Sequence, residues 1–401
     1  MRGRPRRLAL LGAAAALAAP ALLFGQTAPD AGPGYPAGAS AEFKEVARRA
    51  EEARAAGRLD ESVRLYWRAI EMQPEWTPGW WSLGTMLYSL ERFEEARDMF
   101  RRVVGAAPED ANSWALKGLC ELELRSYDRA LSDLQRARLM GLENKEIEHV
   151  AGYHLGTLLT RYEQYETSLE LLADLTRQGN ESASLVEALG LSVLRLPYLP
   201  AELPTRYREM VLMAGRATKH WSHGRREPAR AGFEELLLRF PDERNVHYAF
   251  GVFLLREDQD RALQQFQREI EINPYHVESM LQIALEKMVR GDLEEAKQLA
   301  EKAVVLAPQV AAGQNTLGRI LLQTGDVEGA IEHLERGVAI APTSRQMRFE
   351  LARAYTRAGR TEDAAREREE FRRLDEAQRA GGAGAPMGAG LDRQAGEQAP
   401  E

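Results

Sequence analysis

Prolines that recur at a fixed spacing constrain this chain more than any other feature. They stand at Pro74 and Pro108, then at Pro241, Pro274, Pro308 and Pro342, with intervals of 34, 33, 34 and 34 residues within the two runs. A proline cannot continue an α-helix, because its ring removes a backbone donor and crowds the preceding turn. Regular intervals of this length mark an array of repeats. A compact helical bundle is the alternative.

Other residues fall into register when the chain is aligned on these prolines. In one unit they are Trp80, Leu83, Gly84, Leu87, Ala96, Phe100 and Pro108, which fit the pattern W-x2-L-G-x2-Y, A-x3-F and P. Further copies contain Trp114, Gly118 and Ala130, then Ala217, Ala229 and Phe233, then Gly251, Ala262 and Phe266, then Ala284 and Ala296, and finally Gly318 and Ala330. This pattern resembles the tetratricopeptide repeat family. The resemblance implies an all-α fold, a right-handed α-solenoid of helix-turn-helix repeats.

The residue types explain why such units would fold. Apolar positions recur at intervals of three and four, which predicts two amphipathic helices of about a dozen residues in each unit. A small residue in the first helix, such as Gly84 or Gly318, lets the two backbones approach closely. Between the helices, where a C-terminal cap requires a positive φ, stand Gly57, Gly224, Gly291, Gly325 and Gly359. One pair of helices cannot bury its apolar face alone, so neighbouring pairs must stack.

The register fails between Glu181 and Arg208, where Pro197, Pro200 and Pro204 forbid a regular helix. We therefore expect the solenoid to be interrupted by a proline-rich elbow at 196–204. The predicted divisions are a signal peptide at 1–25, a flexible linker at 26–41, an N-terminal array at 42–180, an irregular repeat with the elbow at 181–209, a C-terminal array at 210–376 and a disordered tail at 377–401.

The first residues have the composition of a secretory signal. Four arginines lie within Met1–Arg7, and residues 8–24 then contain no charge. This segment is at the short end for crossing a bilayer of about 30 Å, so an uncleaved membrane anchor is the second choice. We expect an exported protein, periplasmic or secreted, whose only membrane contact is through this segment if it remains uncleaved.

Composition and motifs exclude several classes of function. The net charge of −8 argues against a general nucleic-acid binder, which normally carries a basic face. The single cysteine, Cys120, excludes an intramolecular disulfide. No phosphate-binding loop, metalloprotease motif or nucleophile elbow is present. His220 and His223 have metal-ligand spacing, but the sequence places no third ligand. We expect no catalysis, no cofactor and no metal site.

The resemblance implies that the first helix of each unit lines a concave surface that binds a protein or peptide. We call the residues predicted to line it the inner-stripe residues. They are Trp81, Tyr88, Leu119, Leu122, Tyr153, Trp221, Tyr248, Leu255, Leu281, Met288 and Phe349. Five of the six tryptophans lie between Trp67 and Trp114, which favours the N-terminal half as the anchor. The alternative is that several of these side chains fill the interior of a tightly wound solenoid.

The sequence therefore predicts a non-catalytic interaction scaffold of the cell envelope, with a partner that it does not identify. One alternative is an exported sensory protein that binds a small ligand or a metal. Another is an intracellular chaperone adaptor, which would need basic and Asn residues to hold a C-terminal carboxylate. The corresponding positions include Ala47, Trp81, Ala115 and Leu119, which do not match that requirement.

Overall fold

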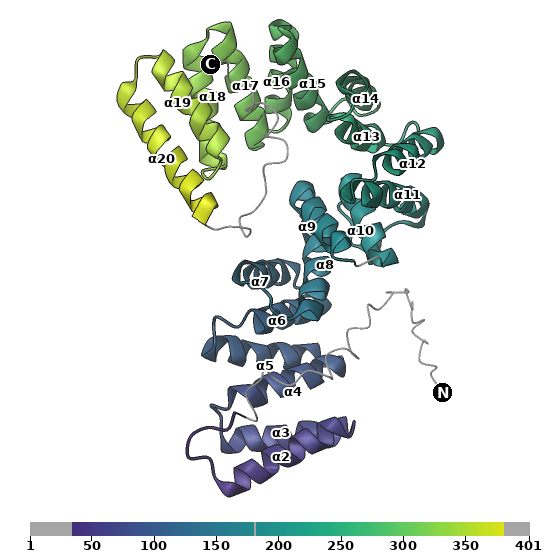
Figure 1. Ribbon diagram of the computed structural model, residues 1–401, viewed down its shortest axis with the longest axis vertical. Helices are drawn as coiled ribbons and strands as arrows, with labels where there is room; N and C mark the ends of the chain where they lie inside the picture. Colours follow the sequence, from purple (N-terminus) through teal and green to yellow (C-terminus); the bar gives the residue numbers. More distant parts are fainter. Residues whose placement is uncertain (1–33, 180–181, 381–401) are drawn as a thin grey trace, which may run out of the picture. The chain divides into compact units, whose positions relative to one another are not determined.

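The computed structural model describes residues 34–179 and 182–380, and within these residues every regular element is a helix (Figure 1). The prediction of an all-α fold of paired helices is confirmed. The predicted signal peptide at 1–25 lies outside the described residues, as do half of the predicted linker and most of the predicted tail. No helix in the described part of the chain is long and apolar enough to cross a membrane.

The described residues divide into two compact units. The first unit runs to Ser192 and includes Leu196–Thr205, whereas the second contains Val193–Arg195 and the chain from Arg206 onward. The helices up to the boundary are α2 (Ala41–Ala55), α3 (Leu59–Met72), α4 (Thr77–Ser89), α5 (Phe93–Ala106), α6 (Ala111–Glu123), α7 (Tyr127–Met140), α8 (Lys145–Arg161), α9 (Tyr165–Arg177), α10 (Ala183–Val193) and the 3-10 helix η2 (Pro200–Glu202).

The helices that follow form the second unit. They are α11 (Thr205–Ser222), α12 (Arg226–Arg239), α13 (Val246–Leu254), α14 (Gln259–Ile272), α15 (Val277–Arg290), α16 (Leu293–Leu306), α17 (Ala311–Thr324), α18 (Val327–Ile340), α19 (Arg345–Arg357) and α20 (Thr361–Ala380). From α2 to α9 in the first unit, and from α12 to α20 in the second, helices that are consecutive in the chain pack against one another. Each unit is thus a stack of helical hairpins.

Small residues bring the two helices of a hairpin together, as the repeat pattern predicts. A Cβ atom added to Gly156 of α8 would lie 2.5 Å from Leu172 of α9, and one added to Gly251 of α13 would lie 2.6 Å from Phe266 of α14. Distances this short leave no room for a side chain. The large residue of the second helix therefore fills the space above the glycine.

The turn inside most hairpins contains a residue with a positive φ. The five predicted glycines all adopt it, with φ from 69° to 93°. The same conformation is held by a non-glycine residue at Glu91, Arg125, Glu163 and Arg195. In each of these turns a backbone N–H reaches back five residues, as from Arg92 to the Leu87 carbonyl at 2.9 Å. This hydrogen bond closes the end of the first helix.

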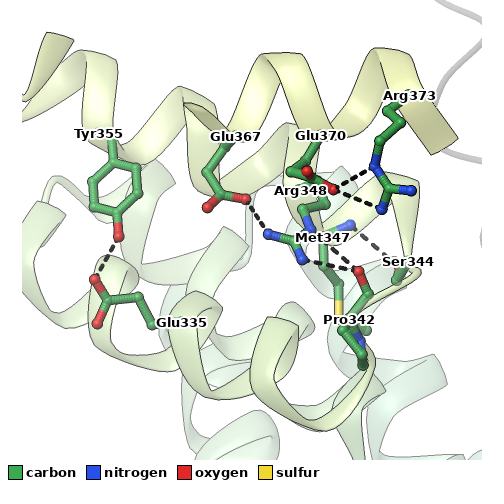
Figure 2. Close-up of polar contacts among 9 residues, drawn as sticks. All are labelled: Glu335, Pro342, Ser344, Met347, Arg348, Tyr355, Glu367, Glu370 and Arg373. Atoms are coloured by element: carbon green, nitrogen blue, oxygen red, sulfur yellow. Dashed lines mark hydrogen bonds and ion pairs between the residues drawn. The ribbon is translucent and has the colours of Figure 1, made fainter. Parts of the chain in front are cut away.

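A second recurring hydrogen bond fixes the turn between hairpins. In five of the six repeats, the side chain six residues after the repeat proline donates to the proline carbonyl oxygen; the exception is Met280, which follows Pro274. The pairs are Trp80 with Pro74, Trp114 with Pro108, His247 with Pro241, Gln314 with Pro308 and Arg348 with Pro342, at 2.8 to 3.2 Å. Figure 2 shows the last of these pairs. The leading residue of the repeat pattern therefore varies in type while it keeps one structural role.

The segment between the two arrays is irregular apart from η2. It is held to the first unit by an ion pair between Arg161 of α8 and Glu202, and by packing of Leu199 against the apolar core. The next helix begins at Thr205, ahead of the expected position 210. At the other end, α20 continues four residues past the predicted boundary at 376, and Asp375 near that end pairs with Arg345 of α19.

Candidate functional site

The inner-stripe residues differ widely in their exposure to solvent. Seven of them are buried, with at most 8% of their surface exposed: Trp81, Tyr88, Leu119, Tyr153, Tyr248, Leu281 and Met288. Three others, Leu122, Trp221 and Leu255, are half-buried. Phe349 is 49% exposed. The structure thus places most of the predicted binding side chains inside their own unit.

In the first unit, the inner stripe is packed into the core. Every residue from 81 to 88 of α4 is buried, which includes the polar side chains of Ser82 and Thr85. The ring of Tyr88 lies edge-on to that of Phe93, with ring centroids 5.3 Å apart. These contacts are those of a packed interior, and a binding role for Trp81 and Tyr88 stays a prediction.

In the second unit, Tyr248 takes part in a buried polar cluster. Its ring centroid lies 4.7 Å from that of His276, and the Arg195 guanidinium lies 5.5 Å from its ring. The His276 Nδ1 accepts a hydrogen bond from the Ser279 N–H at 3.0 Å, which caps the first turn of α15. Burial lowers the pKa of His276 to about 4, with Arg195 acting in the same direction and Glu278 opposing it. His276 is therefore neutral at pH 7.

A buried carboxylate in the same unit has a structural role. Glu269 of α14 is fully buried and accepts hydrogen bonds from the backbone N–H groups of Asn245 and Tyr248, at 2.8 and 3.2 Å. These are unsatisfied donors at the start of α13, so the carboxylate caps that helix. Burial raises the pKa of Glu269, while the two hydrogen bonds oppose that shift.

The two histidines with metal-ligand spacing lie near the end of α11. Trp221, which stands between them, packs edge-on against Phe253 with ring centroids 5.8 Å apart. The His223 Nδ1 lies 2.8 Å from the Lys219 carbonyl oxygen. Within residues 34–179 and 182–380, no three His, Cys, Asp or Glu side chains are grouped so that they could hold a metal ion.

An accessible surface with mixed chemistry lies on two neighbouring first helices, α17 and α19. Phe349 of α19 is its exposed aromatic group; the Arg353 guanidinium lies 5.9 Å from that ring, and Phe371 of α20 lies 6.1 Å away between ring centroids. We call this the α17–α19 surface and define it by Asn315, Arg319, Gln346, Phe349 and Arg353.

Glu350 links the arginines of the α17–α19 surface. Its carboxylate lies 3.6 Å from the Arg319 Nε and 2.7 Å from the Arg353 Nη1. The side chains of Arg319 and Glu350 are only 14% and 8% exposed, whereas that of Arg353 is 57% exposed. Because one carboxylate is shared by two guanidinium groups, the cluster has an excess of positive charge. Arg353 carries that charge into solvent.

Two amide side chains of this surface each have an oxygen that lacks a hydrogen bond. The Asn315 Oδ1 and the Gln346 Oε1 are buried atoms that accept no hydrogen bond. Asn315 lies four residues before Arg319, and Gln346 lies three before Phe349, so each amide shares a helix side with its neighbour on the surface. A buried oxygen without a donor costs about 1–3 kcal/mol, so these two amides are places where the packing of the surface is less than optimal.

Sequence reasoning identified Phe349 but missed the polar members of this surface. The inner-stripe rule also reaches Asn315, yet only apolar and aromatic residues were selected from it. The available signal was the helix Arg345–Arg357 itself, which contains four arginines and one glutamate in a chain of net charge −8. A basic helix in an acidic protein points to a surface with acidic partners.

The second helices fix α19 in position. Arg348 of α19 pairs with Glu367 of α20 at 2.8 Å, and Tyr355 of α19 donates to Glu335 of α18 at 2.6 Å (Figure 2). Arg348 and Glu367 have side chains that are only 15% and 17% exposed. Charged hydrogen bonds of this kind, shielded from solvent, hold a helix more firmly than exposed pairs do. The α17–α19 surface therefore rests on a rigid support.

Two family models match the chain. The model described as tetratricopeptide repeat matches residues 47–110 and 82–140. The model described as the middle TPR-like domain of cilia and flagella-associated protein 70 matches residues 215–375. A comparison with curated proteins found no match to the sequence.

Solved structures of the protein MamA are similar to part of the chain. A MamA RS-1 double mutant is 19% identical, with a TM-score of 0.39 over 43% of this chain and 97% of its own. MamA from residue 41 onward, from Desulfovibrio magneticus RS-1, is 19% identical, with a TM-score of 0.38 over 42% of this chain and 97% of its own. A further crystal structure of MamA is 15% identical, with a TM-score of 0.37 over 43% and 94%.

Proposed function

We propose that this chain, which belongs to the tetratricopeptide repeat family, is a non-catalytic scaffold that binds a segment of a partner protein on the α17–α19 surface. The observation that carries this proposal is the exposure of Phe349, at 49%, on a first helix that also supplies the 57% exposed Arg353. Interfaces are enriched in aromatic side chains and arginine, which supply most of the binding energy.

The chemistry of the surface favours an extended segment with an apolar side chain and an acidic one. Phe349 offers apolar contact area, and the exposed Arg353 offers a charged donor. A large part of the surface is preformed, so little ordering is required when a partner binds.

The test compares single variants for capture of a partner that has first been isolated with the wild-type chain. Phe349→Ala and Arg353→Ala should each weaken the measured affinity by about tenfold or more. Leu238→Ala is the matched control, because Leu238 is 82% exposed in the same unit but lies on α12, outside the surface. Full affinity of the Phe349→Ala variant for the partner would contradict the proposal. If only Trp81→Ala or Tyr88→Ala lowers the affinity, the binding site lies in the first unit instead.

We also propose that the protein acts outside the cytoplasm. The support is the arginine-rich start followed by the uncharged segment 8–24. The mature chain should begin near Gln26 and be recovered from the envelope or medium. N-terminal sequencing that finds Met1, together with recovery from the cytosol, would refute export.

A further inference from the structure

A hollow lies in the first unit between the turn at Pro74, the start of α4 and the end of α5. Its volume is about 760 Å³, and it is lined by Trp80, Gly105 and Ala106 and by the charged residues Glu75, Asp98, Arg101 and Arg102. The Trp80 indole forms one wall, held by its hydrogen bond to the Pro74 carbonyl at 2.8 Å, with the Arg102 guanidinium 5.8 Å from the ring. The floor is open because Gly105 and Ala106, at the end of α5, have almost no side chain.

The next repeat has a protruding apolar group where this repeat has the hollow. Trp114 stands 34 residues after Trp80 and makes the same hydrogen bond, to the Pro108 carbonyl at 2.9 Å. The residues that correspond to Gly105 and Ala106 are Leu139 and Met140, at the end of α7. Leu139 is 75% exposed and Met140 is 36% exposed. We call this pair the knob.

We propose that two copies of this chain associate through this side of α5 and α7, with the knob of each copy seated in the hollow of the other. The hollow and the knob occupy one register position in consecutive repeats. A two-fold axis between the two repeats therefore brings both knobs to both hollows at once. Such an interface is self-complementary and closed, as symmetric dimers require.

The polar groups at the rim have matching charges. Arg102 is exposed beside the hollow, and Glu143 is exposed in the turn that follows the knob. Glu75 is exposed at the other rim of the hollow, and Arg138 is exposed on the turn of α7 that precedes the knob. The same two-fold operation places acidic and basic groups on facing rims, which favours a second copy over a hydrophobic ligand.

The first experiment measures self-association of the full chain by sedimentation over a wide range of concentrations. Leu139→Asp should weaken association by about tenfold or more, because it removes the apolar contact of Leu139 with the Trp80 ring and requires a carboxylate to lose its water. Val305→Asp is the matched control, since Val305 stands at the same position of α16 in the second unit and is 80% exposed. A wild-type chain that stays monomeric, or equal loss in both variants, would overturn the proposal.

A second variant fills the hollow without disturbing the fold. A Cβ atom added to Gly105 meets no heavy atom within 4 Å, and leucine is a better helix former than glycine. Gly105→Leu should therefore raise the melting temperature while it abolishes association. Self-association that persists in this variant would place the interface elsewhere.

Cross-linking tests the arrangement directly. The only native cysteine, Cys120, is buried, so it should not form disulfides with cysteines introduced at the surface. When Gly105→Cys and Leu139→Cys chains are mixed, oxidation should produce a covalent dimer that neither variant forms alone. A dimer that never acquires this cross-link would overturn the knob-and-hollow arrangement.

Discussion

The same repeat pattern produces two different inner surfaces, one at α4 of the first unit and one at α17 and α19 of the second. In the first unit, the aromatic side chains of Trp81 and Tyr88 are 8% exposed, and they take part in the core. In the second unit, α17 and α19 place Asn315, Arg319 and Arg353 at the inner positions, and Phe349 stays half exposed beside them. The inner face is therefore not uniform along the second unit, because Tyr248, Leu281 and Met288 are buried like Trp81, whereas Phe349 on the last described hairpin stays exposed.

The hairpin turns show a second difference. Three turns of the first unit hold Glu91, Arg125 and Glu163 at φ values of 57° to 60°, where a side chain is strained. The turns after α11, α15, α17 and α19 of the second unit have glycine at the corresponding position. Because glycine adopts a positive φ without this strain, the turns of the second unit are less strained. The stability of the first unit therefore depends more on the packing of its core.

The largest expected effect concerns the two inner aromatics. Trp81→Ala should lower the free energy of unfolding of the first unit by about 3–5 kcal/mol, as for other large core residues. Phe349→Ala should change the stability of the second unit by no more than about 1 kcal/mol, because half of its ring already contacts solvent. Denaturant unfolding followed by circular dichroism measures both.

Hydrogen exchange resolved along the chain is the control for this comparison, because the two units need not unfold together. Protection should fall in α4 and its neighbours for Trp81→Ala and remain unchanged there for Phe349→Ala. If both substitutions change stability by equal, small amounts, Trp81 is not a core residue, and its predicted role in partner binding is favoured again.

A smaller effect is expected from acid. Burial lowers the pKa of His276 in the second unit and of His154 in the first to about 4. Below pH 6.5 each of these histidines binds a proton in the unfolded chain but stays neutral in the folded chain until the pH nears 4. The folded state therefore has its full stability above pH 6.5 and loses stability as the pH falls toward 4. Each residue contributes up to about 3 kcal/mol to this loss.

The substitution His276→Asn separates the two units in this test. An asparagine side chain can still accept from the Ser279 N–H and cap α15, but it does not titrate. The acid loss should shrink in the second unit and persist in the first. If the pH dependence of both units is unchanged, His276 does not carry it.

The sequence predicted the parts of the fold that depend on local chemistry. The glycine at 156 meets Leu172, and Gly325 adopts a φ of 93°, because small size and conformational freedom are properties of the residue itself. The repeat spacing was sufficient to pair the helices. It could not show that Glu163 adopts φ 60°, because no residue type there signals a turn and the packed helices on either side impose it.

The candidate site was predicted only in part. The inner-stripe rule reached Phe349, which is exposed on the first helix of the last described hairpin. The same rule could not separate Phe349 from Trp81, because burial depends on how closely the next repeat packs and not on the position within a helix. Asn315 and Gln346 were missed because an open amide oxygen is visible only once all hydrogen bonds are placed.

The smallest expected effect is on the turns and tests their difference directly. Glu163→Gly should stabilise the first unit by about 1 kcal/mol, because it removes the strain of a side chain at positive φ. The reverse change, Gly325→Glu, should destabilise the second unit by a similar amount, since no neighbouring atom within 4 Å would clash and only the backbone strain is added. Thermal and urea unfolding of both variants measure the pair. If Glu163→Gly is neutral or destabilising, the Glu163 side chain makes a compensating contribution and the first unit does not depend on its core to hold strained turns.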